Sequence, residues 1–175
     1  MTTLTDARGR PLPEIEAPTA ERLRAYGDML FLAFRSDRHT QMPVSVLRTY
    51  LEPALVRGQF RIFRFDGIPR AMYTWAWLTP EAERRLVTGE PLSPEDWSGG
   101  ERLWLVDLIA PYRGLMGSIG RWIMQRGNLT ETEFLFRRVT GQNTTRRIVH
   151  VDFRRDHLAK IYGQDDFLAT LPQLP

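Results

Sequence analysis

One apolar run constrains the fold more than any other part of the chain. Residues 103–110 read LWLVDLIA, between the turn residues Ser98-Gly99-Gly100 and Pro111. A short apolar run bounded by glycine and proline is typical of a strand that is buried on both faces. Asp107 lies in the middle of this run, and an unpaired buried carboxylate costs several kcal/mol. We therefore expect a partner for Asp107 elsewhere in the chain, and His39 is the leading candidate.

The size and composition predict one globular domain. The chain has 175 residues, of which 42% are hydrophobic, and no cysteine. Residues 1–18 are rich in Pro, Thr and charge and predict a flexible N-terminal arm, whereas residues 19–175 predict a single domain. Without cysteine there are no disulfides or thiolate metal sites, which fits a cytoplasmic protein. No apolar run reaches the roughly 18 residues of a membrane span, and the N-terminus lacks the apolar core of a secretory signal.

The positive charge comes almost entirely from arginine. The net charge is +3, and Lys160 is the one lysine in the chain. A GC-rich coding sequence is the simplest explanation, but arginine also binds carboxylates and phosphates bidentately. An arginine-rich module that binds nucleic acid is the non-enzymatic alternative, and it predicts a salt-dependent affinity. The modest net charge, the 21 acidic residues and the lack of a nucleic-acid-binding motif argue against it.

The periodicity along the chain predicts an α/β (α+β) domain around a mixed sheet. Helices are expected from Thr19 to Arg35, after Pro43, from Pro80 to Leu86 and from Leu115 to Gln125. A hairpin is expected over 59–66 and 70–78, with Asp66-Gly67 as its turn, followed by the central strand and two further strands over 134–140 and 147–153. Residues 36–39 are expected to form a polar loop, and the chain after residue 153 is expected to be irregular.

Histidines and carboxylates suggest two possible sites. His39 lies in the polar loop between two helices and is suited to general base catalysis, although a surface histidine is equally consistent with the spacing. His150 and His157 lie near Asp152 and Asp156. That spacing matches no zinc signature, and we therefore predict no metal site there.

The segment after the central strand has the pattern of an anion site. A strand followed by a glycine-rich turn and a helix N-terminus presents backbone N–H groups and the positive end of the helix dipole. The segment resembles the acyl-CoA pyrophosphate loop of the GNAT acetyltransferases, except that Met116 stands where that loop has glycine. A CoA-dependent GNAT N-acetyltransferase is therefore the alternative enzyme. The residues of this hypothetical acyl-donor loop are Pro111, Tyr112, Arg113, Gly114 and Gly117.

Several blocks in the same order resemble one family, the RTX toxin-activating, hemolysin C-like lysine acyltransferases. The resemblance covers about Gly27 to Gly114, half of the chain, and continues more faintly to about Phe153. Its most specific blocks are Ser36-x-x-His39-x-x-x-Pro43-Val44-Ser45, Pro69 with Trp75-Ala76-x-Leu78, Glu95-Asp96-Trp97-x-x-Gly100 and Trp104-x-x-Asp107-x-Ile109-Ala110-Pro111. Met42, Gly99, Glu101 and Arg113 depart from the family's pattern.

The resemblance implies a GNAT-like fold and the transfer of a fatty acyl group to lysine. The family's catalytic histidine falls on His39, its catalytic aspartate on Asp107 and a supporting serine on Ser36. The implied donor is acyl-carrier protein with its phosphopantetheine thioester, with no bound cofactor, and the implied acceptor is an internal lysine of an RTX-type protoxin. Family members can form homodimers. His39 would act as a general base or, alternatively, carry the acyl group as an acyl-His39 intermediate.

Overall fold

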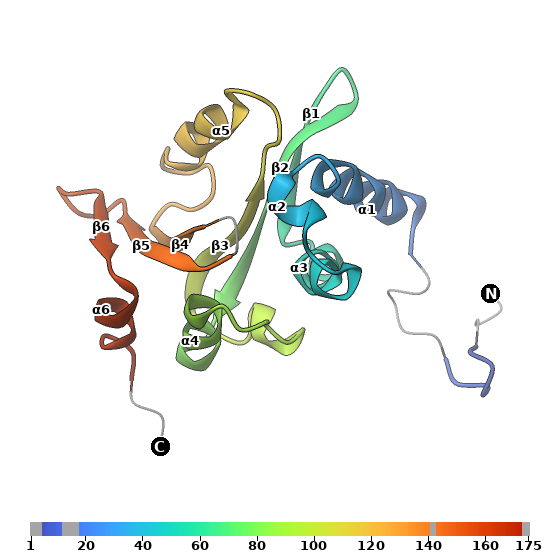
Figure 1. Ribbon diagram of the computed structural model, residues 1–175, viewed down its shortest axis with the longest axis horizontal. Coiled ribbons are helices and arrows are strands. Elements are labelled where there is room, and N and C mark those ends of the chain that lie inside the picture. The colour runs from blue at the N-terminus through green and yellow to red at the C-terminus, as the bar shows by residue number, and fades with distance from the viewer. Residues whose placement is uncertain (1–4, 12–17, 141–142, 173–175) are drawn as a thin grey trace.

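A six-stranded sheet with helices on both faces forms the protein (Figure 1). The computed structural model describes residues 5–11, 18–140 and 143–172. The strands lie in sequence order from β1 to β6, and every neighbouring pair is antiparallel except the parallel pair β3–β4. The expected mixed, mostly antiparallel α/β sheet flanked by helices is thus confirmed.

The elements follow the expected order, with additions near the C-terminus. The helices are α1 (Ala20–Ala33), α2 (Asp37–Thr40), α3 (Val44–Arg57), α4 (Pro80–Thr88), α5 (Leu115–Ile123) and α6 (Gln164–Leu168), with a 3₁₀ turn, η2 (Glu95–Ser98). The strands are β1 (Phe60–Phe65), β2 (Ile68–Leu78), β3 (Arg102–Ile109), β4 (Glu133–Val139), β5 (Thr145–Asp152) and β6 (Ala159–Tyr162).

Local sequence signals explain several of these boundaries. Thr19 caps α1 by accepting a hydrogen bond from the N–H of Arg22, and Thr79 caps α4 in the same way. Asp66 and Gly67 join β1 to β2 with φ angles of 52° and 76°. Positive φ at both central residues is the geometry of the two-residue turns that suit the twist of a hairpin.

The helices cover the two faces of the sheet unequally. On one face, α1, α3, α4 and α6 pack on residues such as Met72 and Trp104. On the other face, α5 alone packs through Ile119 and Ile123 (Figure 1). One thinly covered face leaves room for a groove beside α5.

Strand β3 is buried along nearly its whole length, as its sequence predicts. Two features disturb it near Asp107. In its pairing with β2, Thr74 faces Asp107 while Trp75 faces Leu105, which makes Val106 an extra, bulged residue. Its pairing with β4 is limited to Trp104 with Leu135 and Leu105 with Phe136. A bulge re-aims the side chains that follow it, and the short pairing leaves β3 and β4 apart beyond Leu105.

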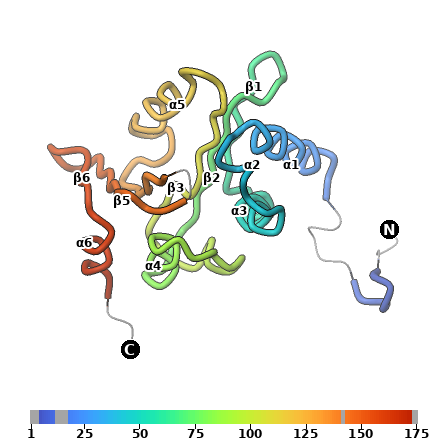
Figure 2. The backbone as a smooth tube through the Cα atoms, viewed as in Figure 1, coloured from blue at the N-terminus to red at the C-terminus, as the bar shows by residue number. Residues whose placement is uncertain are grey.

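Three expectations need correction or lie beyond the described chain. Residues 37–40 form the short helix α2 within the expected loop, and the C-terminal region expected to be irregular contains β6 and α6, which follow β5 along the edge of the molecule (Figure 2). Of the N-terminal arm, residues 5–11 form a turn closed by the bridge Thr5–Pro11, whereas residues 1–4 and 12–17 lie outside the described residues.

None of the described helices has the length and hydropathy of a membrane span.

Strand β6 carries the chain's one lysine. Side chains alternate between the two faces along a strand. The ammonium group of Lys160 lies 4.6 Å from the centre of the Tyr162 ring, and Tyr162 packs on the face covered by α4 and α6. Ala159 and Ile161 therefore point to the opposite face, which carries α5.

Candidate functional site

Asp107 and His39 are in direct contact, as the burial of Asp107 predicts. The Nε2 atom of His39 lies 2.7 Å from Oδ2 of Asp107. His39 comes from α2, which begins just after α1 ends, and Asp107 follows the bulge in β3. Both residues are almost completely buried. The helix that replaces the expected loop thus delivers the imidazole to the central strand.

The second nitrogen of His39 is also engaged. Its Nδ1 atom lies 2.7 Å from Oγ of Ser36, which is only partly buried. Because an ionised Asp107 accepts a hydrogen bond from the N–H at Nε2, Nδ1 is left as the acceptor for the Ser36 hydroxyl. The result is a hydrogen-bonded chain from Ser36 through His39 to Asp107, with the hydroxyl as its accessible end. The same order of groups, hydroxyl, imidazole and carboxylate, is used in catalytic triads.

Asp107 is held as a carboxylate. Burial alone raises the pKa of the Asp107 carboxyl, but the charges of His39 and Arg38, the hydrogen bond from His39 and the backbone N–H of Leu108 outweigh it. The pKa therefore lies well below its usual range. The Arg38 guanidinium binds Oδ1 and the N–H of Leu108 donates to the same oxygen, so that each carboxylate oxygen is satisfied. A fixed negative charge stabilises an imidazolium when His39 takes up a proton.

A second buried cation lies close to this pair. Arg137, on β4, donates to the side-chain oxygen of Asn143 at 3.1 Å and to the Tyr50 hydroxyl at 3.4 Å. Arg38 donates to the same Asn143 oxygen at 3.2 Å, which links the two guanidinium groups. Burial lowers the pKa of Arg137, although an arginine stays charged at neutral pH. Its Nε atom is buried and has no hydrogen-bond partner in the described part of the chain.

A groove of about 910 Å³ opens where β3 and β4 diverge. Asp107, Arg38 and Arg137 line its polar end, while His39 contacts Asp107 but is not part of the wall. The rest of the wall is mostly apolar and comes from α5 and from strands β3 to β6. Its apolar residues include Leu105, Met116, Ile123, Met124, Phe134, Phe136, Val149 and Ile161. A mostly apolar groove with a few polar groups is the usual form of a small-molecule site.

The residues of the expected donor loop are only partly at this groove. Pro111, Tyr112 and Arg113 form the turn after β3, and Gly114 caps α5 with a φ of 79°. Gly117 lies in the first turn of α5 and lines the groove, whereas residues 111–114 are not part of its wall.

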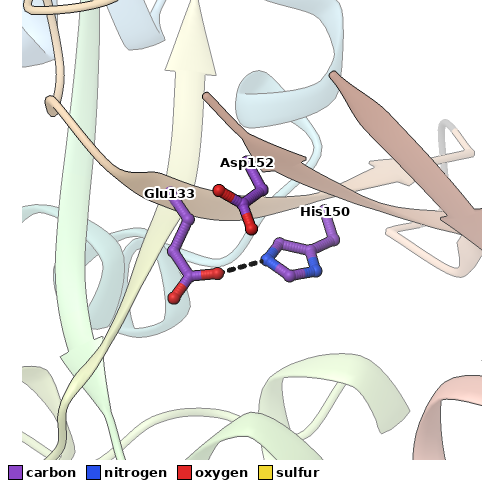
Figure 3. Close-up of side chains that lie close together, drawn as sticks. All are labelled: Glu133, His150 and Asp152. Atoms are coloured by element: carbon purple, nitrogen blue, oxygen red, sulfur yellow. Dashed lines mark hydrogen bonds and ion pairs between the residues drawn. The ribbon is translucent and has the colours of Figure 1, made fainter. Parts of the chain in front are cut away.

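The histidine in β5 belongs to a separate cluster (Figure 3). The Nε2 atom of His150 lies 2.8 Å from Glu133, and the ligand atoms of these two residues and of Asp152 lie within 4.8 Å of one another. Arg154 binds both carboxylates and Arg155 binds Asp152. Two guanidinium groups therefore match the two carboxylates, which favours an ion-pair network at this position over a metal site.

Three residues at the site are absent from the expectations above. Arg137 carries a signal that could have found it, because an arginine in the strand sequence FLFRRV poses the same problem as an aspartate in LWLVDLIA. Arg38 lies within the Ser36-x-x-His39 block. Asn143 has a φ of 62°, and its position between two guanidinium groups depends on a turn that its sequence does not reveal.

Comparisons with known proteins point to one family. The model of the RTX toxin acyltransferase family matches residues 18–151. The RTX-III toxin-activating lysine-acyltransferase of Actinobacillus pleuropneumoniae is 32% identical over 126 residues, which are 71% of each chain.

Two other similar proteins share shorter regions. The RTX-II toxin-activating lysine-acyltransferase of the same organism is 37% identical over 87 residues, 49% of this chain and 54% of that protein. The protein-lysine myristoyltransferase of Kingella kingae is 32% identical over 93 residues, 53% of this chain and 56% of that protein. In these two alignments the chain spans about half the length of the curated relative.

Proposed function

Because the chain belongs to the RTX toxin acyltransferase family, we propose that it transfers a fatty acyl group from acyl-carrier protein to internal lysines of an RTX-type protoxin. The observation that carries the proposal is the Ser36–His39–Asp107 chain at the polar end of an apolar groove. The proposed cellular setting is the cytoplasm, where both the carrier protein and an unsecreted protoxin are available.

His39 is the proposed general base. A lysine with a pKa of about 10.4 is neutral in roughly one molecule per thousand at pH 7.4, a deficit of about 4 kcal/mol. The lysine nitrogen attacks the thioester carbon and gives a proton to the Ser36 oxygen as Ser36 gives its own proton to Nδ1 of His39. Asp107 stabilises the imidazolium, which then returns the proton to the pantetheine thiolate as the carbon–sulfur bond breaks. An amide and a free thiol are the products.

The arginines at the groove suit both the reacting carbonyl and the donor. Arg38 borders the groove and binds Asp107, so its guanidinium group is placed to stabilise the negative charge that develops on the thioester oxygen. Arg137, Arg121 and Arg138 also line the groove, and Asp107 is the one acidic residue among its described wall residues. A phosphopantetheine on an acidic carrier protein complements such a wall.

A CoA-dependent acetyltransferase is less consistent with the groove. The splayed parallel pair β3–β4 supports a GNAT-like interpretation of the fold, but Met116 replaces a glycine of the CoA loop. The long apolar wall also exceeds what an acetyl group needs.

The test is mass spectrometry of a lysine-bearing RTX-repeat protein after incubation with the enzyme and a palmitoyl-carrier-protein thioester. Acyl amides on internal lysines are the expected result. Parallel reactions contain acetyl-CoA, palmitoyl-CoA or no enzyme. Modification by acetyl-CoA alone would support the acetyltransferase instead, and unmodified lysines with every donor would reject the proposed reaction.

A further inference from the structure

Two glycines in α5 have no structural requirement that explains them. Gly117 and Gly120 lie inside a nine-residue helix, where each glycine is less favourable than alanine by about 1 kcal/mol. Neither has the positive φ that favours glycine. A Cβ atom at Gly120 would meet nothing within 4 Å, and one at Gly117 would meet only Nη1 of Arg121, at 3.6 Å. The backbone and the packing would therefore accept a side chain at both positions.

Both glycines face the groove. They line it together with Met116 and Met124, which lie four positions before and four positions after Gly120 and therefore on the same side of the helix as Gly120. A side chain at either glycine would thus project into the groove. What the two glycines provide is empty volume in this groove.

The opposite wall is an apolar row that crosses four strands. Leu105 pairs with Phe136, Phe136 with Val149, and Val149 with Ile161. Three strand spacings of about 4.8 Å make this row about 14 Å long. It begins two residues before Asp107 on β3 and ends at the edge strand β6, where Ile161 is 60% exposed. A row of this length, open at its far end, fits an extended alkyl chain better than a compact group.

The polar end of the groove independently indicates a bound ligand. Arg137 is nine-tenths buried and lines the groove, and its Nε atom has no partner among the described residues. A buried unsatisfied donor costs free energy, and a polar ligand group beside it removes that cost. A ligand with a polar head at Arg137 and Asp107 and an alkyl tail along the row satisfies both ends of the groove.

We propose that Gly117 and Gly120 determine the acyl-chain length that this enzyme accepts, by leaving space for a long chain between α5 and the row from Leu105 to Ile161. The inference rests on the proposed acyltransfer and specifies the substrate class of the same groove. It predicts that long acyl chains lie across the sheet with their ends near β6. A side chain at position 120 then shortens the space available to the chain.

The test is Gly120→Leu, compared with wild type for palmitoyl, octanoyl and butanoyl thioesters of the carrier protein. We expect kcat/KM for the palmitoyl donor to fall at least about tenfold, with the butanoyl donor within about twofold, since filling a pocket discriminates by roughly 10- to 200-fold. Gly27→Leu is the matched control, because Gly27 is also an open helical glycine but lies in α1, away from the groove. An unchanged ratio of palmitoyl to butanoyl rates in Gly120→Leu would overturn the inference.

Binding measurements keep the inference separate from the proposed reaction. Calorimetry with palmitoyl-pantetheine and butanoyl-pantetheine is expected to show a loss of palmitoyl affinity in Gly120→Leu and none in Gly27→Leu. Equal palmitoyl affinity in wild type and Gly120→Leu contradicts the inference even where transfer occurs. If wild type transfers no acyl group but binds palmitoyl-pantetheine, and Gly120→Leu weakens that binding, the proposed reaction is rejected. The assignment of the groove to a long acyl chain is then still supported. Gly120→Ala, which is expected to raise the melting temperature, provides a variant that folds if leucine does not.

Discussion

Two histidine–carboxylate pairs in this protein have almost the same distance and different surroundings. His39 lies 2.7 Å from Asp107, and His150 lies 2.8 Å from Glu133. In the first pair the exposed fractions of the side chains are 1% and 3%, and in the second they are 14% and 40%. The first pair joins residues 68 positions apart and borders the groove, whereas the second joins neighbouring strands (Figure 3).

The difference shows that a short contact is not by itself a sign of catalysis. At the buried pair, Ser36 provides an accessible proton route, Arg38 a positive charge and the groove a place for substrate. At the more exposed pair, the half-exposed Arg154 binds both Glu133 and Asp152, and ion pairs that reach solvent contribute little. The proposed function therefore depends on the additional groups beside the histidine–carboxylate pair, Ser36 and Arg38, and on the adjacent groove, more than on the pair itself.

The largest contrast is expected from removing each histidine. His39→Ala eliminates the proposed base and is expected to lower the rate of lysine acylation at least about 10³-fold. His150→Ala is expected to leave the rate within about twofold, because His150 pairs with Glu133 and is not part of the groove wall. Initial rates from intact-protein mass spectrometry of the acceptor would compare the two. Similar losses in both variants would show that the exposed pair also takes part in the reaction.

The next contrast concerns the carboxylates. Asp107→Asn keeps the shape of the side chain but removes the charge that stabilises an imidazolium, and is expected to lower kcat by about 10²–10⁴-fold. It also replaces the charged acceptor of Arg38 and of the Leu108 N–H with a weaker, neutral amide oxygen, at a cost of about 1–3 kcal/mol in the free energy of unfolding. Glu133→Gln is the matched control, with an expected change below about 1 kcal/mol. Kinetics and urea unfolding would measure both effects, and near-normal kcat in Asp107→Asn would contradict the role of Asp107.

Ser36→Ala tests the accessible end of the hydrogen-bonded chain. If Ser36 only relays a proton to His39, a water molecule can take its place in Ser36→Ala. The acylation rate is then expected to fall about tenfold, because one hydrogen bond is worth about 1–1.5 kcal/mol. An acyl-serine intermediate predicts complete loss, and also an acylated enzyme in the wild-type reaction. Single-turnover kinetics together with the intact mass of the enzyme would distinguish the two routes. An unchanged rate would mean that Ser36 carries no proton in the reaction.

The smallest expected effect concerns the acid dependence of stability. The folded-state pKa of Asp107 is depressed below its ordinary value of 3.8, so its contribution is present above that value and is lost as the pH falls below it. The difference in unfolding free energy between wild type and Asp107→Asn is therefore expected to stay constant down to about pH 5 and to shrink as the pH falls further, toward about pH 2. Urea unfolding at several pH values would test this. A difference that grows in acid would mean that Asp107 is not held ionised.

Where sequence alone succeeded, the physical constraint was local or unavoidable. The apolar run around Asp107 had to be a buried strand, and a buried carboxylate had to find a partner, so the contact with His39 could be anticipated. Capping by Thr19 and the turn at Asp66-Gly67 depend on neighbouring residues only. The chemical roles of His39, Asp107 and Ser36 remain predictions from the family resemblance and from this geometry.

Where sequence alone failed, the decisive forces were tertiary. Helix α2 is one turn long and is fixed by the contacts of His39, and residues 159–162 form an edge strand without the apolar alternation that marks strands. The groove arises from the limited pairing of β3 with β4, which no periodicity encodes. Arg137 enters the site because β4 runs parallel to β3 and places it near Asp107.

The position of Lys160 has a practical consequence for the proposed acylation of lysines. Its ammonium group rests on Tyr162, on the side of the sheet away from the groove, and no other lysine exists in the chain. The enzyme therefore offers no lysine of its own as a rival target in the groove. An acyl adduct that accumulates during turnover on any side chain other than Lys160 would report a covalent intermediate, and the mass of the protein would therefore show which route the reaction takes.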